Sequence, residues 1–238
     1  MSERASLFVW LVLPYAAIAV FAVGHWWRYR HDQFGWTTGS TQMLESRQLA
    51  WGSTLFHFGA LAVIAGHVLG ILVPASATAA VGVSESAYHD LSGIAGSIAG
   101  FVCLVGFGIL AFRRSTVRRV RVTTTLADVL VFVLLAVLLG TGQAAVFGYN
   151  VVGEGYDYRA TVGPWFRTLF FDPQPSLMAE TPALFQLHAA LPWMLYALWP
   201  FSRLVHAWSV PLQYLGRPYI LYRRRYGTET SKRPLRAR

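Results

Sequence analysis

The sequence predicts an all-α integral membrane protein, a bundle of five helices that cross a bilayer. Of its 238 residues, 55% are hydrophobic and only 13% are charged, whereas a soluble domain carries about 25% Asp, Glu, Lys and Arg. The apolar residues form five stretches, each near the roughly 20 residues that a helix needs to cross the hydrocarbon layer. They cover approximately 7–27, 51–73, 90–112, 125–147 and 183–207. A membrane barrel is disfavoured, because its strands would be short and alternating.

The first stretch is expected to remain in the protein as a helix, with a cleaved secretory signal as the alternative. The preceding Ser2-Glu3-Arg4 is not net basic, and residues 25–30 after the stretch are aromatic and basic, as is typical of a retained span. The longest connection, 148–182, contains several prolines and aromatic residues. It is predicted to form either a short helix lying on the membrane or a plain loop.

The distribution of basic residues predicts the orientation of the helices. The 20 Lys and Arg lie mainly in the connections 28–50 and 113–124 and in the tail from 208. Such connections face the cytoplasm, which places the N-terminus outside and the C-terminus inside. The chain then divides into a transmembrane domain, 1–211, and a basic cytoplasmic tail, 212–238. The net charge of +9 is explained by this topology and by affinity for anionic lipid, which leaves no support for nucleic-acid binding.

The chain has a single cysteine, Cys103. One thiol cannot form an internal disulfide, hold an iron–sulfur cluster or attach a c-type haem. Any redox centre must therefore be held by other residues.

Four histidines are predicted to lie within or at the end of membrane spans. His57 and His67 lie in the second stretch, while His188 and His206 lie in the fifth. Ionisable side chains in a span are costly and indicate function. His57 and His67 are separated by about 15 Å along a helix. Because the fifth stretch runs in the opposite direction, His67 is expected to pair with His188 near the outer face, and His57 with His206 near the inner face.

This pairing is the arrangement that two bis-histidine haems require, stacked between the second and fifth helices. On an undistorted helix His188 and His206 would project from one side, although Pro192 and Pro200 can bend the helix. Four glycines of the second stretch leave room for a macrocycle or, alternatively, allow close helix packing. They are Gly52, Gly59, Gly66 and Gly70.

The chain resembles the gamma subunit of respiratory nitrate reductase over nearly its whole length. The segments that carry the resemblance are Ser40-Thr41-Gln42-Met43-Leu44, Leu55-Phe56-His57, Gly66-His67, the run 121–125 with Asp128, and the run 201–211. The resemblance implies a five-helix dihaem cytochrome b in the cytoplasmic membrane of a bacterium or archaeon. The family's ligand pairs fall on His57 with His206 and on His67 with His188.

The resemblance also implies a function as part of a quinol:nitrate oxidoreductase. Such a subunit oxidises menaquinol or ubiquinol near the outer face and does not reduce nitrate alone. Its electrons pass through the two b haems to an iron–sulfur beta subunit. A molybdenum-containing alpha subunit then reduces nitrate to nitrite in the cytoplasm. The tail after Pro211 is expected to dock on the beta subunit, with a lipid-bound or disordered end as the alternative.

The site for quinol is expected beside His67. Some members of the family have a lysine at the outer start of the third helix, where this sequence has Tyr88-His89. His67, Tyr88 and His89 are therefore the candidate quinol-site residues. Arg114 and Arg203 are expected to bind haem propionates, because guanidinium pairs with carboxylate in a bidentate way.

Two other functions compete with this interpretation. One is a related quinol-oxidising cytochrome b of a sulfite- or heterodisulfide-reductase-like complex, which the match from Arg203 to Pro211 disfavours. The other is a haem-free, proton-coupled transporter that uses histidines within the membrane. Five helices give no even inverted repeat, which disfavours the transporter.

Overall fold

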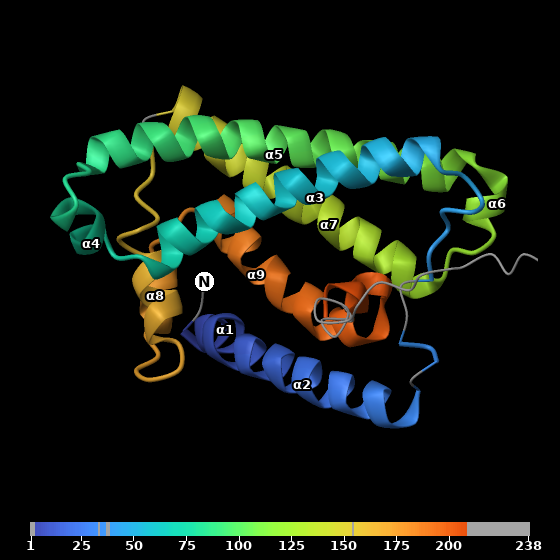
Figure 1. Cartoon of the computed structure of the whole chain (residues 1–238). Helices are drawn as coiled ribbons and strands as arrows, with labels where there is room; N and C mark the ends of the chain where they lie inside the picture. Colours follow the sequence, from blue (N-terminus) through green and yellow to red (C-terminus); the bar gives the residue numbers. More distant parts are fainter. Residues whose placement is uncertain (1–2, 33, 37–38, 154, 209–238) are drawn as a thin grey trace, which may run out of the picture.

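The computed structural model describes residues 3–32, 34–36, 39–153 and 155–208, and every regular element in these ranges is a helix (Figure 1). The predicted tail, 212–238, lies outside the described residues. Four helices are long and apolar enough to cross a membrane: Glu3–His31, Arg47–Leu72, Glu85–Thr116 and Leu126–Val152. They coincide with the first four predicted stretches, so the prediction of an all-α membrane protein is confirmed.

Three of the four long helices contain a π-helical segment. The first consists of α1 Glu3–Leu7, η1 Phe8–Val12 and α2 Leu13–His31, and the second of α3 Arg47–His67 and η2 Val68–Leu72. The third is the unbroken α5 Glu85–Thr116, and the fourth joins α7 Leu126–Ala145 to η3 Val146–Val152. Short helices in the connections are α4 Ala75–Ala80, α6 Arg118–Arg121, α8 Val162–Thr168 and η4 Pro175–Met178. Below, the two ends of the bundle are called the α6 end and the α8 end (Figure 1).

The fifth predicted stretch, 183–207, does not form one long helix, which corrects the expectation of a single span there, and the chain breaks at Pro200, one of the two prolines expected to be able to bend it. Its α-helix, α9 Ala183–Leu198, is 16 residues long, and two 3-10 segments follow it, η5 Trp199–Phe201 and η6 Arg203–Ala207. The break occurs at Pro200, which has no N–H to continue the helical hydrogen bonds. Ser202 is then extended, with φ −122° and ψ 177°.

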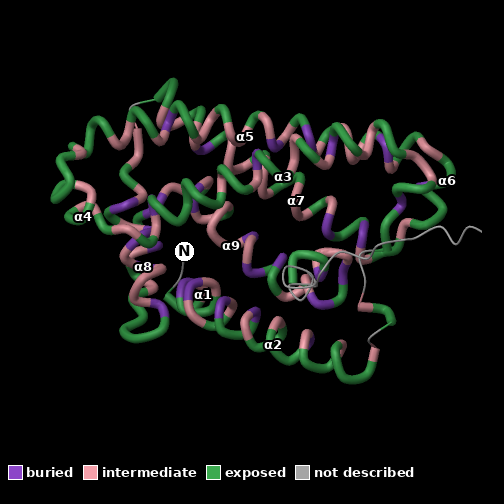
Figure 2. Tube along the Cα trace, in the orientation of Figure 1, coloured by how far each residue is buried: buried purple, intermediate pink, exposed green. Residues whose placement is uncertain are grey.

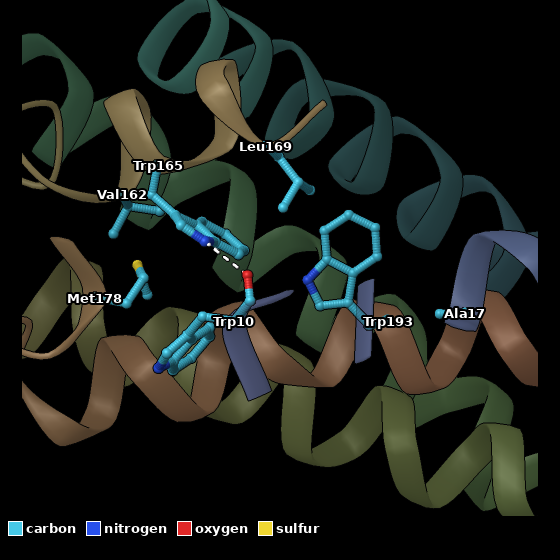
Figure 3. Packing of buried hydrophobic residues seen from close by; sticks show 7 residues of the cluster. All are labelled: Trp10, Ala17, Val162, Trp165, Leu169, Met178 and Trp193. Carbon is cyan, nitrogen blue, oxygen red and sulfur yellow. Dashed lines mark hydrogen bonds between the residues drawn. The ribbon is translucent and has the colours of Figure 1, made fainter. Parts of the chain in front are cut away.

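A cluster of tryptophans joins the first helix to α8 and α9 (Figure 3). Trp165 of α8 is 2% exposed, and its indole N–H donates to the carbonyl of Trp10 at 3.0 Å. The two indole rings meet edge to face, and Trp193 of α9 packs against Trp165 in the same way. The connection 148–182 thus contains a short helix rather than a plain loop, and this helix anchors the α8 end of the bundle.

The α3 and α5 backbones touch because glycines lie where they cross. A Cβ on Gly59 would collide with the backbone of Cys103, and one on Gly106 would collide with the backbone of Phe56. Small residues of this kind allow the close contact that holds helices together in lipid. Phe58 of α3 and Phe101 of α5 are exposed apolar side chains, and Figure 2 shows much of the trace of both helices as exposed, as expected where helices face lipid.

A buried arginine fixes the chain before α3 to the α6 end of α5. Arg113 is 2% exposed, and its Nε donates to the Glu45 carboxylate at 2.6 Å. Its two Nη groups donate to the side chain and carbonyl of Thr41 and to the carbonyl of Glu45. Glu45 also accepts from the Gln48 amide at 2.8 Å in the first turn of α3. The guanidinium thus joins two segments at the α6 end of the bundle.

We expect this clamp to make stability depend on pH in the acid range. Hydrogen bonds from the Gln48 amide and from Arg113 lower the pKa of Glu45 below its ordinary value of 4.5. A lowered folded-state pKa gives a stabilisation that is complete above the ordinary value and is lost as pH falls through the folded value. The melting temperature of the wild type should therefore exceed that of Glu45→Gln at pH 7, and the difference should vanish in acid. Glu180→Gln, at an exposed position, is the control; the same pH dependence there would contradict the assignment to Glu45.

Candidate functional site

The structure brings the four span histidines together as two pairs along α3, one at its middle residue, His57, and one at its last residue, His67. His57 of α3 lies beside His206 of η6, with ring centroids 5.9 Å apart and ring planes at 74°. His67 lies beside His188 of α9, also with centroids 5.9 Å apart, and with planes at 36°. The first pair lies toward the α6 end and the second toward the α8 end. The break at Pro200 therefore does not prevent α9 and η6 from presenting one histidine to each pair.

Each of the four rings forms a hydrogen bond through Nδ1. In His57, His67 and His206 the partner is a backbone carbonyl three or four residues earlier, at 2.7, 2.7 and 2.8 Å. In His188 the partner is the hydroxyl of Thr141 on α7, at 3.2 Å. A carbonyl can only accept, so Nδ1 carries the proton in those three rings. The Nε2 lone pair is then available to a metal. Metal-binding histidines in proteins have this tautomer, in which the other ring N–H donates to a neighbouring acceptor.

The two pairs fit axial ligation of a haem. A metal–imidazole bond is about 2 Å, so two rings on opposite sides of one metal ion have centroids about 6 Å apart. Within the described ranges, no group of three or more His, Cys, Asp or Glu could hold a metal ion. A pair of imidazoles suits a metal whose remaining ligands come from a macrocycle. Near one pair, a Cβ on Gly66 would meet no atom within 4 Å, so this position leaves open space beside His67.

The other glycines of the second stretch serve helix packing instead. Gly52 and Gly59 face α5, and Gly70 faces the hydroxyl of Tyr158. Gly52, Gly59 and Gly70 therefore support the interpretation of close packing. Of the four glycines, only Gly66 borders open space that a macrocycle could use.

A carboxylate between two arginines lies at the α6 end near His206. Asp128 is 4% exposed and pairs with Arg203 at 2.9 Å and with Arg114 at 3.4 Å. Arg203 also donates to the carbonyls of Gly39 and Thr123. Because the Arg203 carbonyl accepts from the His206 ring, this cluster connects α7 to the segment that carries His206.

Residues close to Asp128 in the sequence belong to the same cluster. Thr125 and Asp128 form a capping box at the start of α7, in which each side chain accepts a hydrogen bond from the other residue's backbone N–H. Arg114 donates to Thr124 and lies over the ring of Phe132. The run 121–125 thus forms the turn that brings α7 to the arginines.

A pocket of about 240 Å³ opens at the α8 end, lined by Tyr88, His89, Ser92, Tyr156, Tyr158 and Arg159, among others. The Arg159 guanidinium lies 4.0 Å from the centroid of the Tyr88 ring and donates to Glu85. The Tyr88 and Tyr158 hydroxyls are 3.5 Å apart. Burial and the hydrogen bond to Tyr88 raise the pKa of Tyr158, so its hydroxyl keeps its proton.

The three candidate quinol-site residues are only partly brought together. Tyr88 and His89 both line the pocket, but His67 does not. Tyr158 bridges the distance, because its hydroxyl also faces Gly70 of η2, about one turn beyond His67. Sequence reasoning missed Tyr158 and Arg159, which lie in a connection without a pattern. It also missed Thr141, although the polar run Thr141-Gly142-Gln143 inside an apolar stretch was a usable signal.

Comparisons with known proteins agree with the sequence resemblance. Residues 6–225 match the family described as "Nitrate reductase gamma subunit". The chain is 46% identical over 218 residues to the nitrate reductase gamma chain of Bacillus subtilis, a match that covers 91% of this chain and 97% of that protein. It is 35% identical over 226 residues to the respiratory nitrate reductase 1 gamma chain of Escherichia coli, covering 93% and 98%.

A third relative is a longer protein. The chain is 49% identical over 219 residues to the nitrate reductase-like protein NarX of Mycobacterium tuberculosis. The match covers 91% of this chain but 33% of that protein, so the chain spans about a third of the relative's length.

We expect Asp128 to be the main ionic support of the α6 end. Asp128→Ala removes the buried carboxylate that pairs with Arg114 and Arg203. The free energy of unfolding should therefore fall by about 3 kcal/mol. Asp32→Ala is the control, because Asp32 pairs with Arg28 while 40% exposed, and its loss should cost under about 1 kcal/mol. Denaturant unfolding of the purified protein in detergent compares the two, and equal losses would contradict the role of Asp128.

Proposed function

Because the chain belongs to the nitrate reductase gamma subunit family, we propose that it is the membrane cytochrome b of a quinol:nitrate oxidoreductase. It oxidises quinol near the outer face of a bacterial cytoplasmic membrane and passes electrons to an iron–sulfur beta subunit. A molybdenum-containing alpha subunit then reduces nitrate on the cytoplasmic side. Family membership disfavours both the related cytochrome b of another complex and the haem-free transporter.

The observation that carries this proposal is the presence of two pairs of neighbouring imidazoles along α3, one at its middle and one at its last residue. His67 and His188 would hold one b haem, and His57 and His206 would hold the other. Each haem, when bound, supplies an iron ion that accepts and donates one electron at a time. Two histidines would hold each haem, and a centre held by two imidazoles would suit electron transfer rather than binding of a substrate to the iron. The bundle keeps the two sites at different depths, so electrons move across the membrane.

The direction of electron transfer follows from the proposed orientation. The pair at the α8 end lies near the outer face, and the pair at the α6 end lies near the arginine-rich connections of the cytoplasmic face. Each elementary charge that crosses the whole membrane is worth about 2.3 kcal/mol per 100 mV. Quinol oxidised outside releases its protons there, so inward electron transfer contributes to the membrane potential.

We place the quinol at the pocket beside Tyr88 and His89. The Tyr88 hydroxyl and the His89 imidazole offer hydrogen bonds to the two kinds of oxygen that quinol and quinone present. Tyr158 keeps its proton and lies between Tyr88 and Gly70 of η2, which follows His67, so it lines the path toward the proposed haem. The Arg159 guanidinium lies over the Tyr88 ring. These groups take the place of the lysine that some family members have.

The arginines at the α6 end are proposed to bind haem propionates. Arg203 uses Nη1 and Nη2 for the carbonyls of Gly39 and Thr123, and each of these nitrogens has a second N–H. Arg114 uses Nη1 for its bonds to Thr124 and Asp128. The single carboxylate of Asp128 balances only one of the two positive charges, which leaves the cluster suited to a further anion.

The assignment of ligands is tested by reduced-minus-oxidised spectra of membranes. His67→Ala and His57→Ala should each remove one b-type component and leave the other in place, because each variant deletes one ligand of one pair. His31→Ala changes a histidine outside both pairs and should keep both components. Wild-type spectra from both ligand variants would refute the pairing.

The pocket is tested by comparing two electron donors. Tyr88→Phe and His89→Ala should lower nitrate reduction driven by quinol at least several-fold, because each removes a hydrogen-bonding group from the site. Nitrate reduction driven by an artificial donor on the cytoplasmic side should keep its rate, since it does not use the pocket. A quinol-driven rate equal to that of the wild type in both variants would show that quinol binds elsewhere.

A further inference from the structure

We propose that Thr141 and Gly142 of α7 form a seat that orients the His188 imidazole and lowers the reduction potential of the haem that it shares with His67. Both are positioning residues, since they act through His188. The inference rests on the proposed ligation by His67 and His188, and it adds a role for a helix that carries no ligand.

The hydrogen bonds of Thr141 determine which partner donates. Its hydroxyl lies 2.8 Å from the carbonyl of Val137 and 3.1 Å from that of Leu138, and a carbonyl can only accept. The single hydroxyl proton is therefore used within α7. The oxygen is 3.2 Å from His188 Nδ1, and a ring that binds metal through Nε2 carries its proton on Nδ1. Thr141 must then accept the hydrogen bond from His188.

Gly142 forms the second part of the seat. A Cβ on Gly142 would lie 2.7 Å from Cε1 of His188, which is closer than two carbon atoms can approach without displacement. The missing side chain lets the imidazole lie directly against the α7 backbone. The hydroxyl of the preceding residue is thereby brought to Nδ1, and rotation of the ring toward α7 is blocked.

His188 differs in this respect from the other three histidines. His57, His67 and His206 bond to carbonyls of their own segments, so their orientation follows from local helix geometry. Ser53 also places a hydroxyl 3.2 Å from the His57 ring, but that ring already has its carbonyl at 2.7 Å. For His188 the hydrogen-bonded group comes from a neighbouring helix, so side-chain changes on α7 can alter this ligand alone.

A hydrogen bond donated by the Nδ1–H makes the imidazole a more basic ligand. A more basic ligand stabilises oxidised iron relative to reduced iron and so lowers the potential. Thr141→Val removes the acceptor while keeping the shape of the side chain. The His188 ligand then becomes a weaker donor, and the haem that it binds becomes easier to reduce.

The test is a redox titration of b-type absorbance in membranes that contain the complete complex. In Thr141→Val, the ratio of reduced to oxidised haem of the His67/His188 component should rise about tenfold at a fixed potential, which is about 59 mV for one electron. Thr141→Ser should restore the wild-type potential, and the His57/His206 component serves as the internal reference. Gly142→Ala should broaden or remove the His67/His188 component, because the added methyl group displaces the ring.

Thr54→Val is the matched control, because it makes the same substitution at an exposed position of α3, and both potentials should stay at their wild-type values. If the Thr141→Val protein does not accumulate in the membrane, Thr141→Ala is used in its place. It removes the same hydrogen-bond acceptor and has no branched side chain. A wild-type potential in the variant that accumulates would overturn the inference and would mean that His188 bonds instead to a group such as the nearby Leu138 carbonyl. If His188→Ala kept both spectral components, the proposed ligation itself would fail, which is a different result.

Discussion

The direct contact between the α3 and α5 backbones determines where both histidine pairs can form. Lipid provides little hydrophobic drive for helices to associate, so close van der Waals contact must supply it. Gly59 and Gly106 allow that contact, and α3 carries one histidine of each pair. Any displacement of α3 from α5 would change the distances to His188 and His206 together. The two proposed redox sites thus depend on one packing interface between α3 and α5.

The two ends of the bundle are held by different forces, although they carry similar histidine pairs. At the α8 end, indole rings of Trp10, Trp165 and Trp193 join the first helix to α8 and α9. At the α6 end, Asp128 joins two arginines, and Arg113 holds the chain before α3. Apolar packing is insensitive to salt, whereas partly exposed ion pairs are screened. A charged end suits contact with water and with other charged proteins.

The spans and the histidine pairing could be predicted from the sequence because a bilayer restricts both helix length and depth. Counting residues along two antiparallel helices was enough to match His67 with His188 and His57 with His206. The break after α9 was underestimated, because its effect depends on how Pro200 and Ser202 pack. The Thr141 contact and the pocket around Tyr158 depend on which segments become neighbours. Residue counting along single helices carries no such information.

The source of each ring's hydrogen bond has a consequence for transplanting the site into a designed bundle. An excised α3 would carry His57 and His67 with their acceptors, because each ring bonds to a carbonyl of the same helix. His188 of α9 could not be moved with its own helix alone. Its ring needs the Thr141 hydroxyl and the space left by Gly142, both of which belong to α7. A minimal two-haem scaffold built on this pattern therefore requires three helices, with α7 included although it contributes no ligand.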